Sequence, residues 1–487
     1  MAERLSLATI GSLPAGALRV DPNRLAIGIV HLGVGAFHRA HQAAIVDETI
    51  EMTGDERWGI SAVTMRSEQV VEQLAPQDGL YSVTERGAGA GPIRVIGAIR
   101  EVLSAPREPE AVVARLADPA VAVVTLTVTE KGYRRDGRTG GLDLSDPGTV
   151  ADLGGAAPTT TIGLLVRGLD RRRTTGAGPI SVVCCDNLPE NGVVVRRLVA
   201  DFVDALGAAD LGEWIASNAT FPSTMVDRIT PATTADDLAD VADGLGLEDR
   251  GAVLAEPFRQ WVVEDDFAGA RPDWERAGVQ MVSDVLPWES AKLRLLNATH
   301  SLLAYTGLAL GIGTIAEAVS VPALRRAAER LQRDEVVPTL IAPEGLDARV
   351  YGDTILERFR NPALGHTTRQ VGSDGSQKLA PRLADTITGC LAAGRSPRAS
   401  ALAVAGWMLL VATGAPDLSD PLADRLSGVT TGLSTARDVA GALLGQRDVF
   451  PPALAVGEFP SLVAEAYDAL ALADTVVLAA YLDPEPS

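Results

Sequence analysis

The first half of the chain alternates short apolar runs with longer segments whose apolar side chains recur at helical spacing. The run at 121–128 is apolar almost throughout, which indicates a strand buried on both faces. We predict strands at 25–32, 59–64, 93–99, 121–129, 180–185 and 224–229, with intervening helices that include 39–52, 108–116, 162–173 and 192–206. This alternation predicts a Rossmann-like α/β domain with a doubly wound, mostly parallel sheet.

Beyond about residue 283 the pattern changes to segments rich in Leu, Ala and Arg. The predicted helices there are 290–310, 314–333, 347–359, 399–413 and 460–481. Because strand-like alternation is nearly absent, this part is predicted to be mainly α-helical. A chain of 487 residues is too long for one compact core, so we predict two domains, at 1–282 and 283–487.

Charge and cysteine content narrow the class of protein. The chain has 43 basic and 63 acidic residues and a net charge of −20. Such a surface repels phosphate backbones, which argues against nucleic acid as a general partner. The cysteines, Cys184, Cys185 and Cys390, lack C-x-x-C spacing, which favours a reducing compartment and leaves no cysteine-built zinc site. No signal-like start and no charge-free stretch of about 18 residues is visible, so we expect a cytoplasmic protein without a membrane segment.

The segment 27–38 predicts a strand, a tight turn at Gly33-Val-Gly35 and the start of a helix. Glycines allow the tight turn and a close backbone approach, and the helix start offers free N–H groups and partial positive charge. These features suit the pyrophosphate of a dinucleotide, and they follow the first strand of an α/β domain, where such a fold needs them. His38 stands where a third glycine is usual.

The adenosine end of the cofactor site is less defined. The second predicted strand ends at Thr64-Met65-Arg66 without the acidic residue that usually binds the ribose, and Glu68 is the nearest carboxylate. Arg66 suits either a 2′-phosphate or stacking on adenine, so NADP stays open beside NAD, which the family resemblance given below favours. The residues predicted on the cofactor side are Gly33, Gly35, Ala36, Phe37, His38, Arg66, Thr129 and Glu130.

Four polar residues share one predicted helix at 287–300: Glu289, Lys292, Asn297 and His300. At about 100° per residue they fall within an arc of about 140°, together with two leucines. A solvated patch and a core histidine would be the structural explanation. Taken as a set, they suit chemistry better: a lysine among leucines has a lowered pKa and serves as general base, an asparagine amide binds an alkoxide, and a neutral histidine orients the hydroxyl. These groups suffice to deprotonate a secondary alcohol without a metal.

At these residues the chain resembles the mannitol dehydrogenase family of long-chain, polyol-specific dehydrogenases. The matching stretches are 33–41, 127–133, 185–192, 225–231, 292–300 and 374–378. They occur in the same order and span residues 25 to about 380. The resemblance implies an N-terminal dinucleotide-binding domain, a C-terminal helical domain, and a zinc-free site between them.

The resemblance also implies roles for individual residues. Lys292 would be the general base, Asn187 and Asn297 the oxyanion pocket, and His300 the residue that positions the substrate. Glu289, or less directly Glu130, would pass the proton toward solvent. Asp227, Arg369 and Lys378 would meet the distal hydroxyls or the acid group of the substrate.

Structural explanations stay open for several of these residues. Asn187 precedes Leu-Pro and suits a turn. Asp227 beside Arg228 suits a buried ion pair, and Arg369 and Lys378 suit surface charges on a loop. His38 and His41 are assigned to packing beside the cofactor, and Cys184 and Cys185 to the core.

The substrate is the least determined feature. The family covers mannitol/fructose, arabinitol/xylulose and the sugar-acid pair mannonate/fructuronate. The stretches 130–132 and 372–379 look closer to fructuronate reductases, and Gln370 stands where a mannitol enzyme is expected to carry a second substrate arginine. The alternatives are an arabinitol or mannitol-1-phosphate dehydrogenase, the latter with Arg358, Arg360 and Arg369 as a phosphate-binding cluster, and a non-catalytic nucleotide sensor. A monomer or homodimer is expected.

Overall fold

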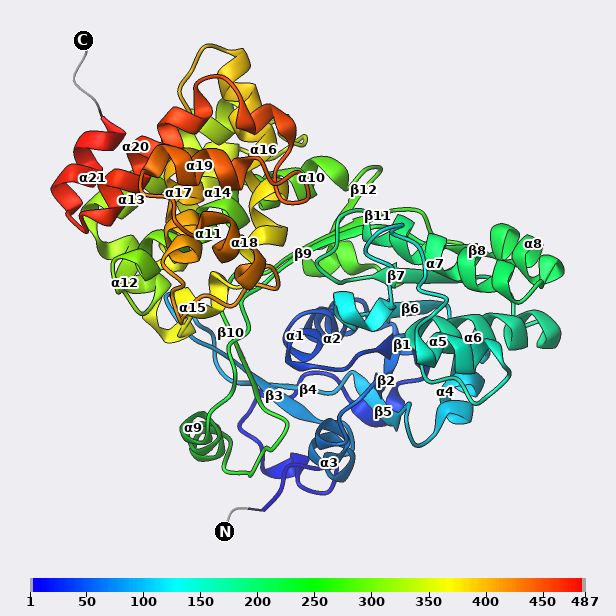
Figure 1. Cartoon of the computed structure of the whole chain (residues 1–487). Coiled ribbons are helices and arrows are strands. Elements are labelled where there is room, and N and C mark those ends of the chain that lie inside the picture. Colours follow the sequence, from blue (N-terminus) through cyan, green and yellow to red (C-terminus); the bar gives the residue numbers. More distant parts are fainter. Residues whose placement is uncertain (1–2, 484–487) are drawn as a thin grey trace. The chain divides into compact units, whose positions relative to one another are not determined.

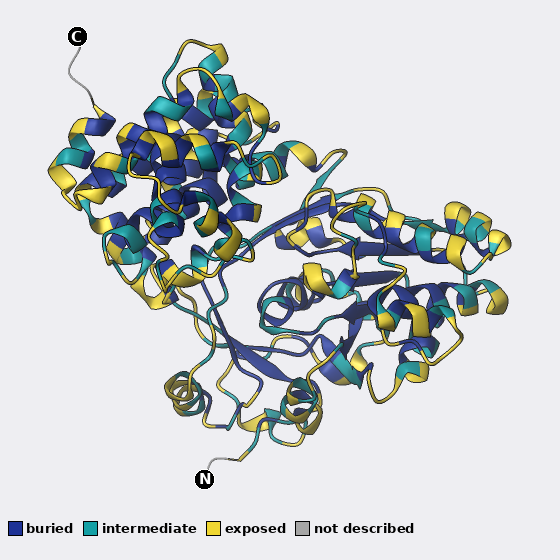
Figure 2. Cartoon of the chain, viewed as in Figure 1, coloured by how far each residue is buried: buried dark blue, intermediate teal, exposed yellow. Residues whose placement is uncertain are grey.

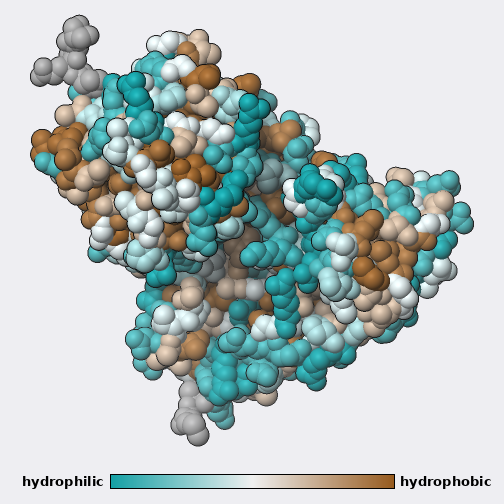
Figure 3. Space-filling view, viewed as in Figure 1, coloured by the Kyte–Doolittle hydropathy of each residue, from teal (hydrophilic) through white to brown (hydrophobic). Residues whose placement is uncertain are grey.

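The computed structural model describes residues 3–483. The chain divides into two compact units, residues 1–285 and 286–487 (Figure 1). Hydrophilic side chains are spread over the visible face of both units (Figure 3). Among the residues described, no helix is long and apolar enough to cross a membrane.

The first unit contains the predicted parallel sheet. Its strands follow the order β5-β2-β1-β6-β7-β8 and every neighbouring pair is parallel. The strands are β1 (Ile27–Leu32), β2 (Gly59–Thr64), β5 (Ile99–Ser104), β6 (Val123–Leu126), β7 (Ile180–Cys184) and β8 (Ala219–Thr220). Numbered within this sheet, the order is the 3-2-1-4-5-6 of doubly wound dinucleotide-binding folds, which confirms the predicted class.

Helices cover both faces of this sheet, as Figure 2 shows by the dark-blue strands between them. The helices of the first unit are α1 (Ala36–Ala40), α2 (Gln42–Thr53), α3 (Gln69–Leu74), α4 (Pro109–Leu116), α5 (Pro147–Leu153), α6 (Thr161–Thr175), α7 (Asn191–Ala205) and α8 (Ala209–Asn218), and α9 (Ala235–Leu245), which packs in a separate small core. Alternate residues of β1 point to opposite faces: Val30 and Leu32 pack in a core with α4, α6 and α7, while Ile29 packs in a core with α1 and α2.

Two smaller sheets correct the predicted strands. The segment 93–99 is not one strand: β4 (Arg94–Ile96) joins β3 (Tyr81–Glu85) and β10 (Val253–Ala255), while β5 starts at Ile99 in the main sheet. The segment 224–229 is also misplaced. Its strand β9 (Thr224–Asp227) pairs antiparallel with β11 (Gln260–Glu264), which pairs in turn with β12 (Gln280–Val282). The predicted helix 39–52 is interrupted at His41 between α1 and α2.

The second unit is helical, as predicted. Its helices are α10 (Leu286–Ala291), α11 (Ala298–Ala309), α12 (Ile315–Ser320), α13 (Pro322–Arg330), α14 (Ala348–Phe359), α15 (Thr368–Val371), α16 (Gly375–Ala392), α17 (Arg398–Ala412), α18 (Ala423–Thr430), α19 (Ala436–Leu444), α20 (Phe459–Ala471) and α21 (Thr475–Leu482). Helix α17 is buried on almost every side and packs against α11 and α20, so it forms the centre of the unit. Two segments are π-helical, Lys292–Asn297 and Leu331–Val336.

Candidate active site

The strand order of the first unit places a topological switch point between β1 and β6. Ligands of doubly wound sheets bind outside the carboxyl ends of the strands at such a point. The predicted glycine turn follows β1, and the segment with Thr129 and Glu130 follows β6. Gly33 has φ +103, and a Cβ there would collide with the carbonyl oxygen of Thr127, so the two segments touch. The structure therefore brings two predicted cofactor-side segments together.

Gly35 has a different reason to be glycine. It caps α1 in an extended conformation that any residue adopts, and a Cβ there would meet only the carbonyl oxygen of Gly33, at 3.8 Å. Packing and backbone geometry thus do not require glycine at this position. What the missing side chain leaves is room at the start of a helix, which fits the close approach of a dinucleotide pyrophosphate.

His38, at the position of the usual third glycine, is fully buried beneath the turn. Its ring stacks on that of His31 with centroids 3.3 Å apart, and both of its nitrogens lie buried without a hydrogen-bond partner. Burial lowers the pKa of His38 well below 6.5 and that of His31 to about 3, so both rings are neutral at neutral pH. His38 and also His41, which stacks on Phe37, therefore pack beside the turn, as expected.

The tautomer of His31 follows from counting donors. Thr127 Oγ donates to the carbonyl oxygen of Gly33 at 2.9 Å, which uses its one proton, so it accepts from His31 Nε2 at 2.9 Å. His31 Nδ1 then accepts from Thr125 Oγ at 2.8 Å. This chain of bonds links the interior of the sheet to the glycine turn and holds the peptide of Gly33.

The burial of His31 predicts a pH dependence of stability. Its pKa is about 3 in the fold and 6.5 in the unfolded chain, so between these values the unfolded chain binds the extra proton and stability falls as pH decreases. From pH 7.5 to pH 5 this group removes about 2 kcal/mol of unfolding free energy. We expect urea unfolding of His31→Gln to show a correspondingly smaller loss over that range than the parent protein.

Comparing the pH dependence of unfolding in the parent protein and in His31→Gln isolates the contribution of His31. Asp47 and Glu335, whose pKa values burial raises to about 6 and about 7, act with the opposite sign and are present in both proteins. An equal pH slope in the parent protein and in His31→Gln would show that His31 takes up its proton in the folded state as easily as in the unfolded chain.

At the adenosine end, the exposed Arg66 follows β2. The nearest carboxylate, Glu68, accepts from Ser104 Oγ at 2.5 Å and pairs with Arg107 at 3.3 Å. Hydrogen bonding to Ser104 lowers the pKa of Glu68, which keeps it ionised. The ends of β2 and β5 thus carry two arginines and one carboxylate that already has partners. This arrangement does not distinguish NAD from NADP.

The carboxyl ends of β6 and β7 expose several predicted residues. Thr129 and Glu130 are exposed after β6, and Asn187 is exposed after β7. Asp227 is buried at the end of β9. The structural alternative for it was an ion pair with Arg228, and Arg228 pairs with Glu85 at 2.7 Å.

In the second unit, the helix that carries the predicted catalytic set is not α-helical throughout. Lys292 and Asn297, each 8% exposed, bound the π-helical segment. A π-helix bonds residue i to residue i+5, so these two residues stack about one turn apart, whereas constant α-helical geometry places them about 140° apart round the helix. His300 follows Asn297 by three residues in α11 and lies on the same face. The angles predicted for a regular α-helix therefore do not apply across the π-helical segment.

His300 has an electrostatic setting that the sequence did not show. Its ring stacks between Phe359, with centroids 4.6 Å apart, and His366, at 5.6 Å. Nε2 is buried without a hydrogen-bond partner. Burial, helped by the positive charges of Arg382, Arg358 and Lys378, lowers the pKa of His300 well below 6.5. A neutral ring with a buried nitrogen that has no partner suits the positioning of a substrate hydroxyl.

Arg382 is the residue of this region that sequence reasoning missed. It lies on α16, and its Nη1 donates to the carbonyl oxygen of Asn297 at 3.2 Å and to Ser301 Oγ at 2.7 Å. Among residues 3–483 no carboxylate forms an ion pair with it. The signal was present: Lys378 and Arg382 are four residues apart on one helix face, a spacing at which like charges repel. Such a pair is more favourable when an anion joins it.

Two other predicted residues lie on helices and not on a loop. Arg369 lies on α15 and Lys378 on α16, whereas a loop was the structural alternative. Arg369 is largely exposed and pairs with Asp417 at 3.2 Å, and Lys378 lies 3.6 Å from Asp374.

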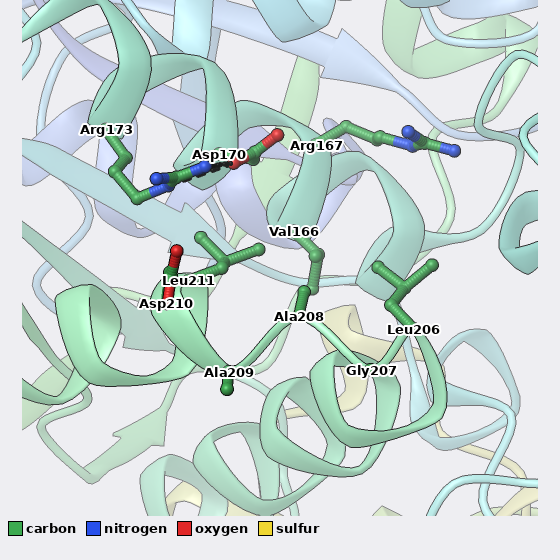
Figure 4. Close-up of a pocket in the computed structure, with 10 residues that line it drawn as sticks. All are labelled: Val166, Arg167, Asp170, Arg173, Leu206, Gly207, Ala208, Ala209, Asp210 and Leu211. Atoms are coloured by element: carbon green, nitrogen blue, oxygen red, sulfur yellow. Dashed lines mark hydrogen bonds and ion pairs between the residues drawn. The ribbon is translucent and has the colours of Figure 1, made fainter.

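Two cavities of the first unit lie away from the predicted residues. One of about 350 Å³ lies between α6 and the turn joining α7 to α8, where Arg173 points to Asp170 (Figure 4). Another of about 500 Å³ lies between α7, α8 and β8. Neither contains a predicted site residue. Within 3–483, no three His, Cys, Asp or Glu side chains gather as metal ligands would.

A 3-2-1-4-5-6 sheet with a glycine turn, followed by a helical unit, is an architecture that suits a nicotinamide-dependent enzyme. Oxidoreductase relatives that match most of the chain show that it is a dehydrogenase acting on CH–OH groups. Residues 27–276 match the mannitol dehydrogenase Rossmann domain and residues 284–471 the mannitol dehydrogenase C-terminal domain. The chain belongs to the mannitol dehydrogenase family.

Individual relatives agree with this assignment. The D-mannonate oxidoreductase of Escherichia coli (strain K12) is 43% identical over 94% of this chain and 96% of its own length. The polyol:NADP oxidoreductase of Gluconobacter oxydans (strain 621H) is 39% identical over 82% of this chain and 84% of its own. The solved structure of Pseudomonas fluorescens mannitol 2-dehydrogenase, a ternary complex with NAD and D-mannitol, superposes with a TM-score of 0.85 at 33% identity and covers 99% of this chain and 100% of that chain.

Proposed function

We propose that this protein interconverts a secondary alcohol and a ketone on a linear sugar acid or polyol with NAD(H), and that D-mannonate/D-fructuronate is the favoured pair over D-mannitol/D-fructose. The observation that carries the preference is Arg382. Its guanidinium lies beside Asn297 and His300 without an ion-pair partner in the described chain, and Lys378 shares its helix. A carboxylate at the end of a hexonate complements these charges.

Each proposed residue has one task. Lys292, as the free amine, accepts the proton of the substrate hydroxyl, and Asn297 and Asn187 donate to the oxygen as it becomes an alkoxide. His300 holds the hydroxyl, and Glu289, or else Glu130, returns the proton to solvent. Asp227, Arg369 and Lys378 bind the distal groups. NAD held by the glycine turn would supply the acceptor for the hydride of the carbinol carbon.

The cofactor proposal is NAD. The P. fluorescens relative was solved with NAD, and a relative at 39% identity is named for NADP, so the preference also needs a direct test. The residues proposed to hold the cofactor are those of the glycine turn and its surroundings: Gly33, Gly35, Ala36, Phe37, His38, Arg66, Thr129 and Glu130.

We expect Gly35→Val to fold normally and to bind NADH at least about tenfold more weakly, because the added side chain fills room that packing leaves empty. NADH fluorescence titration measures the Kd, and thermal unfolding reports the fold. Gly11→Val is the matched control, since a Cβ there meets nothing within 4 Å and Gly11 lies outside the predicted site. Equal NADH affinity in the Gly35 and Gly11 variants would place the cofactor elsewhere.

The substrate proposal is tested with one panel. D-mannonate, D-mannitol, arabinitol and mannitol 1-phosphate, with their keto partners, are assayed with NAD and with NADP, with and without a chelator. We expect the highest kcat/KM for D-mannonate with NAD and no effect of the chelator. A phosphorylated substrate has less support, because Arg360 pairs with Glu357 and Arg369 with Asp417. Turnover of no alcohol would favour the nucleotide sensor. The cytoplasmic location and the monomeric or dimeric state stay predictions.

A further inference from the structure

We propose that Asp186 is a positioning residue: its buried carboxylate holds Thr129 in a left-handed backbone conformation and thereby fixes where Glu130 and Asn187 stand. The inference rests on the proposed function, in which these two side chains face the reacting alcohol. Asp186 itself touches no substrate. It acts through the two segments that follow β6 and β7.

The two segments are neighbours because their strands are. Strands β6 and β7 are parallel partners, with Leu126 opposite Cys184 in the register. Beyond the last pair, the chain at 127–130 therefore runs beside the chain at 185–187. Asp186 lies on the second segment, is only 9% exposed, and its side chain reaches across to the first.

The carboxylate binds both ends of the turn after β6. Its Oδ2 accepts from Val128 N at 2.9 Å and from the Tyr133 hydroxyl at 2.6 Å, and its Oδ1 accepts from Thr129 N at 2.8 Å. Glu130–Tyr133 is a single 3-10 turn, so Glu130 lies between the two points that the carboxylate fixes. An ionised carboxylate is acceptor-only on both oxygens and so complements these three donors best.

Thr129 shows why such a restraint is needed. Its φ of +69 and ψ of 159 lie in a region that essentially only glycine adopts without strain, and threonine, branched at Cβ, is among the residues least suited to it. A conformation of this kind persists only where its surroundings enforce it. The bond from Thr129 N to Asp186 is a direct restraint on that peptide.

The backbone of Asp186 is fixed as well. Its carbonyl oxygen accepts from Asn191 Nδ2 at 3.0 Å and from Leu188 N at 2.9 Å, which encloses Asn187 in a short turn. Asn191 Nδ2 also donates to the carbonyl oxygen of Thr224, the first residue of the strand that carries Asp227. One buried network of hydrogen bonds thus connects the segments that carry Glu130, Asn187 and Asp227.

Stability alone gives a weak reason for an acid at this place. Burial raises the pKa of Asp186 above its ordinary value, against the opposite effect of the hydrogen bonds from Tyr133, Val128 N and Thr129 N. Burying a carboxylate therefore costs free energy. What this carboxylate maintains is a fixed turn that carries Glu130 beside the segment of Asn187.

The test is a double-mutant cycle. We expect Asp186→Asn to lower kcat about 10- to 100-fold, because the amide nitrogen cannot accept from a backbone N–H and small displacements of catalytic groups are costly. NADH Kd should change less than kcat. In a protein that already carries Thr129→Gly, adding Asp186→Asn should lower kcat much less than it does in the parent protein. Glycine keeps a positive φ without a restraint, so the bond from Asp186 is no longer needed there.

Asp152→Asn is the matched control. Asp152 is fully buried and accepts from Thr159 N and Thr160 N, both at 2.9 Å, but it lies on α5 away from the predicted residues. We expect it to lower the unfolding temperature and leave kcat unchanged. If Asp186→Asn behaves as Asp152→Asn does, or if Thr129→Gly restores nothing, the positioning role is wrong. If the parent protein oxidises no alcohol of the panel, the proposed function fails first, and the positioning role falls with it.

Discussion

Replacement of Lys292 by alanine is expected to lower kcat for alcohol oxidation near neutral pH by about 10²- to 10⁴-fold, the range that general-base catalysis contributes. Lys292 is buried in the second unit at the start of the π-helical segment, one turn from Asn297. Without the amine, the base that remains beside Asn297 is His300, whose pKa burial holds well below 6.5, so it accepts the hydroxyl proton far less readily. Initial rates with the best substrate of the panel measure the effect.

Two further measurements separate loss of the base from loss of structure. NADH affinity should stay within about threefold of the parent value, because the proposed cofactor residues all belong to the first unit. Added primary amines, or higher pH, should restore part of the rate by supplying a base from solution. Turnover of Lys292→Ala at the parent rate would contradict the catalytic assignment, and loss of NADH binding together with folding would leave Lys292 a structural residue.

Replacement of Arg382 by methionine is expected to change which substrate is preferred. We expect the ratio of kcat/KM for D-mannonate to kcat/KM for D-mannitol to fall about 30-fold, which corresponds to about 2 kcal/mol for a lost charge-assisted contact. Arg382 also donates to the carbonyl oxygen of Asn297, so activity on both substrates should fall somewhat. The ratio isolates the part that depends on the carboxylate.

Arg360→Met is the control for this experiment. Arg360 is also an arginine of the helical unit, but it is exposed and pairs with Glu357 three residues away. Replacing Arg360 should change kcat/KM for neither D-mannonate nor D-mannitol. If Arg382→Met lowers both kcat/KM values equally, Arg382 supports the helix that carries Asn297 and does not meet the acid group, and the preference for a hexonate loses its main support.

Elements built by local contacts were predictable. Strand β1, the turn at Gly33 and Gly35, and the helix start after it follow one another within a dozen residues, and strands β2 and β7 were predicted within one residue of their ends. In each case the pattern of apolar residues and the glycines lie in the same short segment as the structure they specify.

Elements whose partners lie far away were not predictable. Strands β3 and β10 pair Val83 with Val253, and β9 pairs antiparallel with β11 instead of joining the parallel sheet. The π-helical segment belongs to the same class. Within it, Arg294 is buried and donates to Thr386 Oγ and to the carbonyl oxygen of Thr339, both at 3.0 Å. Contacts between residues so far apart in the sequence leave no periodic pattern of apolar residues around position 294.

The amino-acid sequence by itself determined the chemistry that this protein has available: a glycine turn for a dinucleotide, and Lys292, Asn297 and His300 on one helix. These are properties of residue type and short spacing. Only the tertiary structure decided which other groups act with them. It placed Arg382 beside Asn297, paired Arg369 with Asp417, and directed the carboxylate of Asp186 to the backbone of Thr129. Such contacts depend on strand order and helix packing, because the folding of distant segments against one another, not neighbourhood in the chain, brings these side chains together.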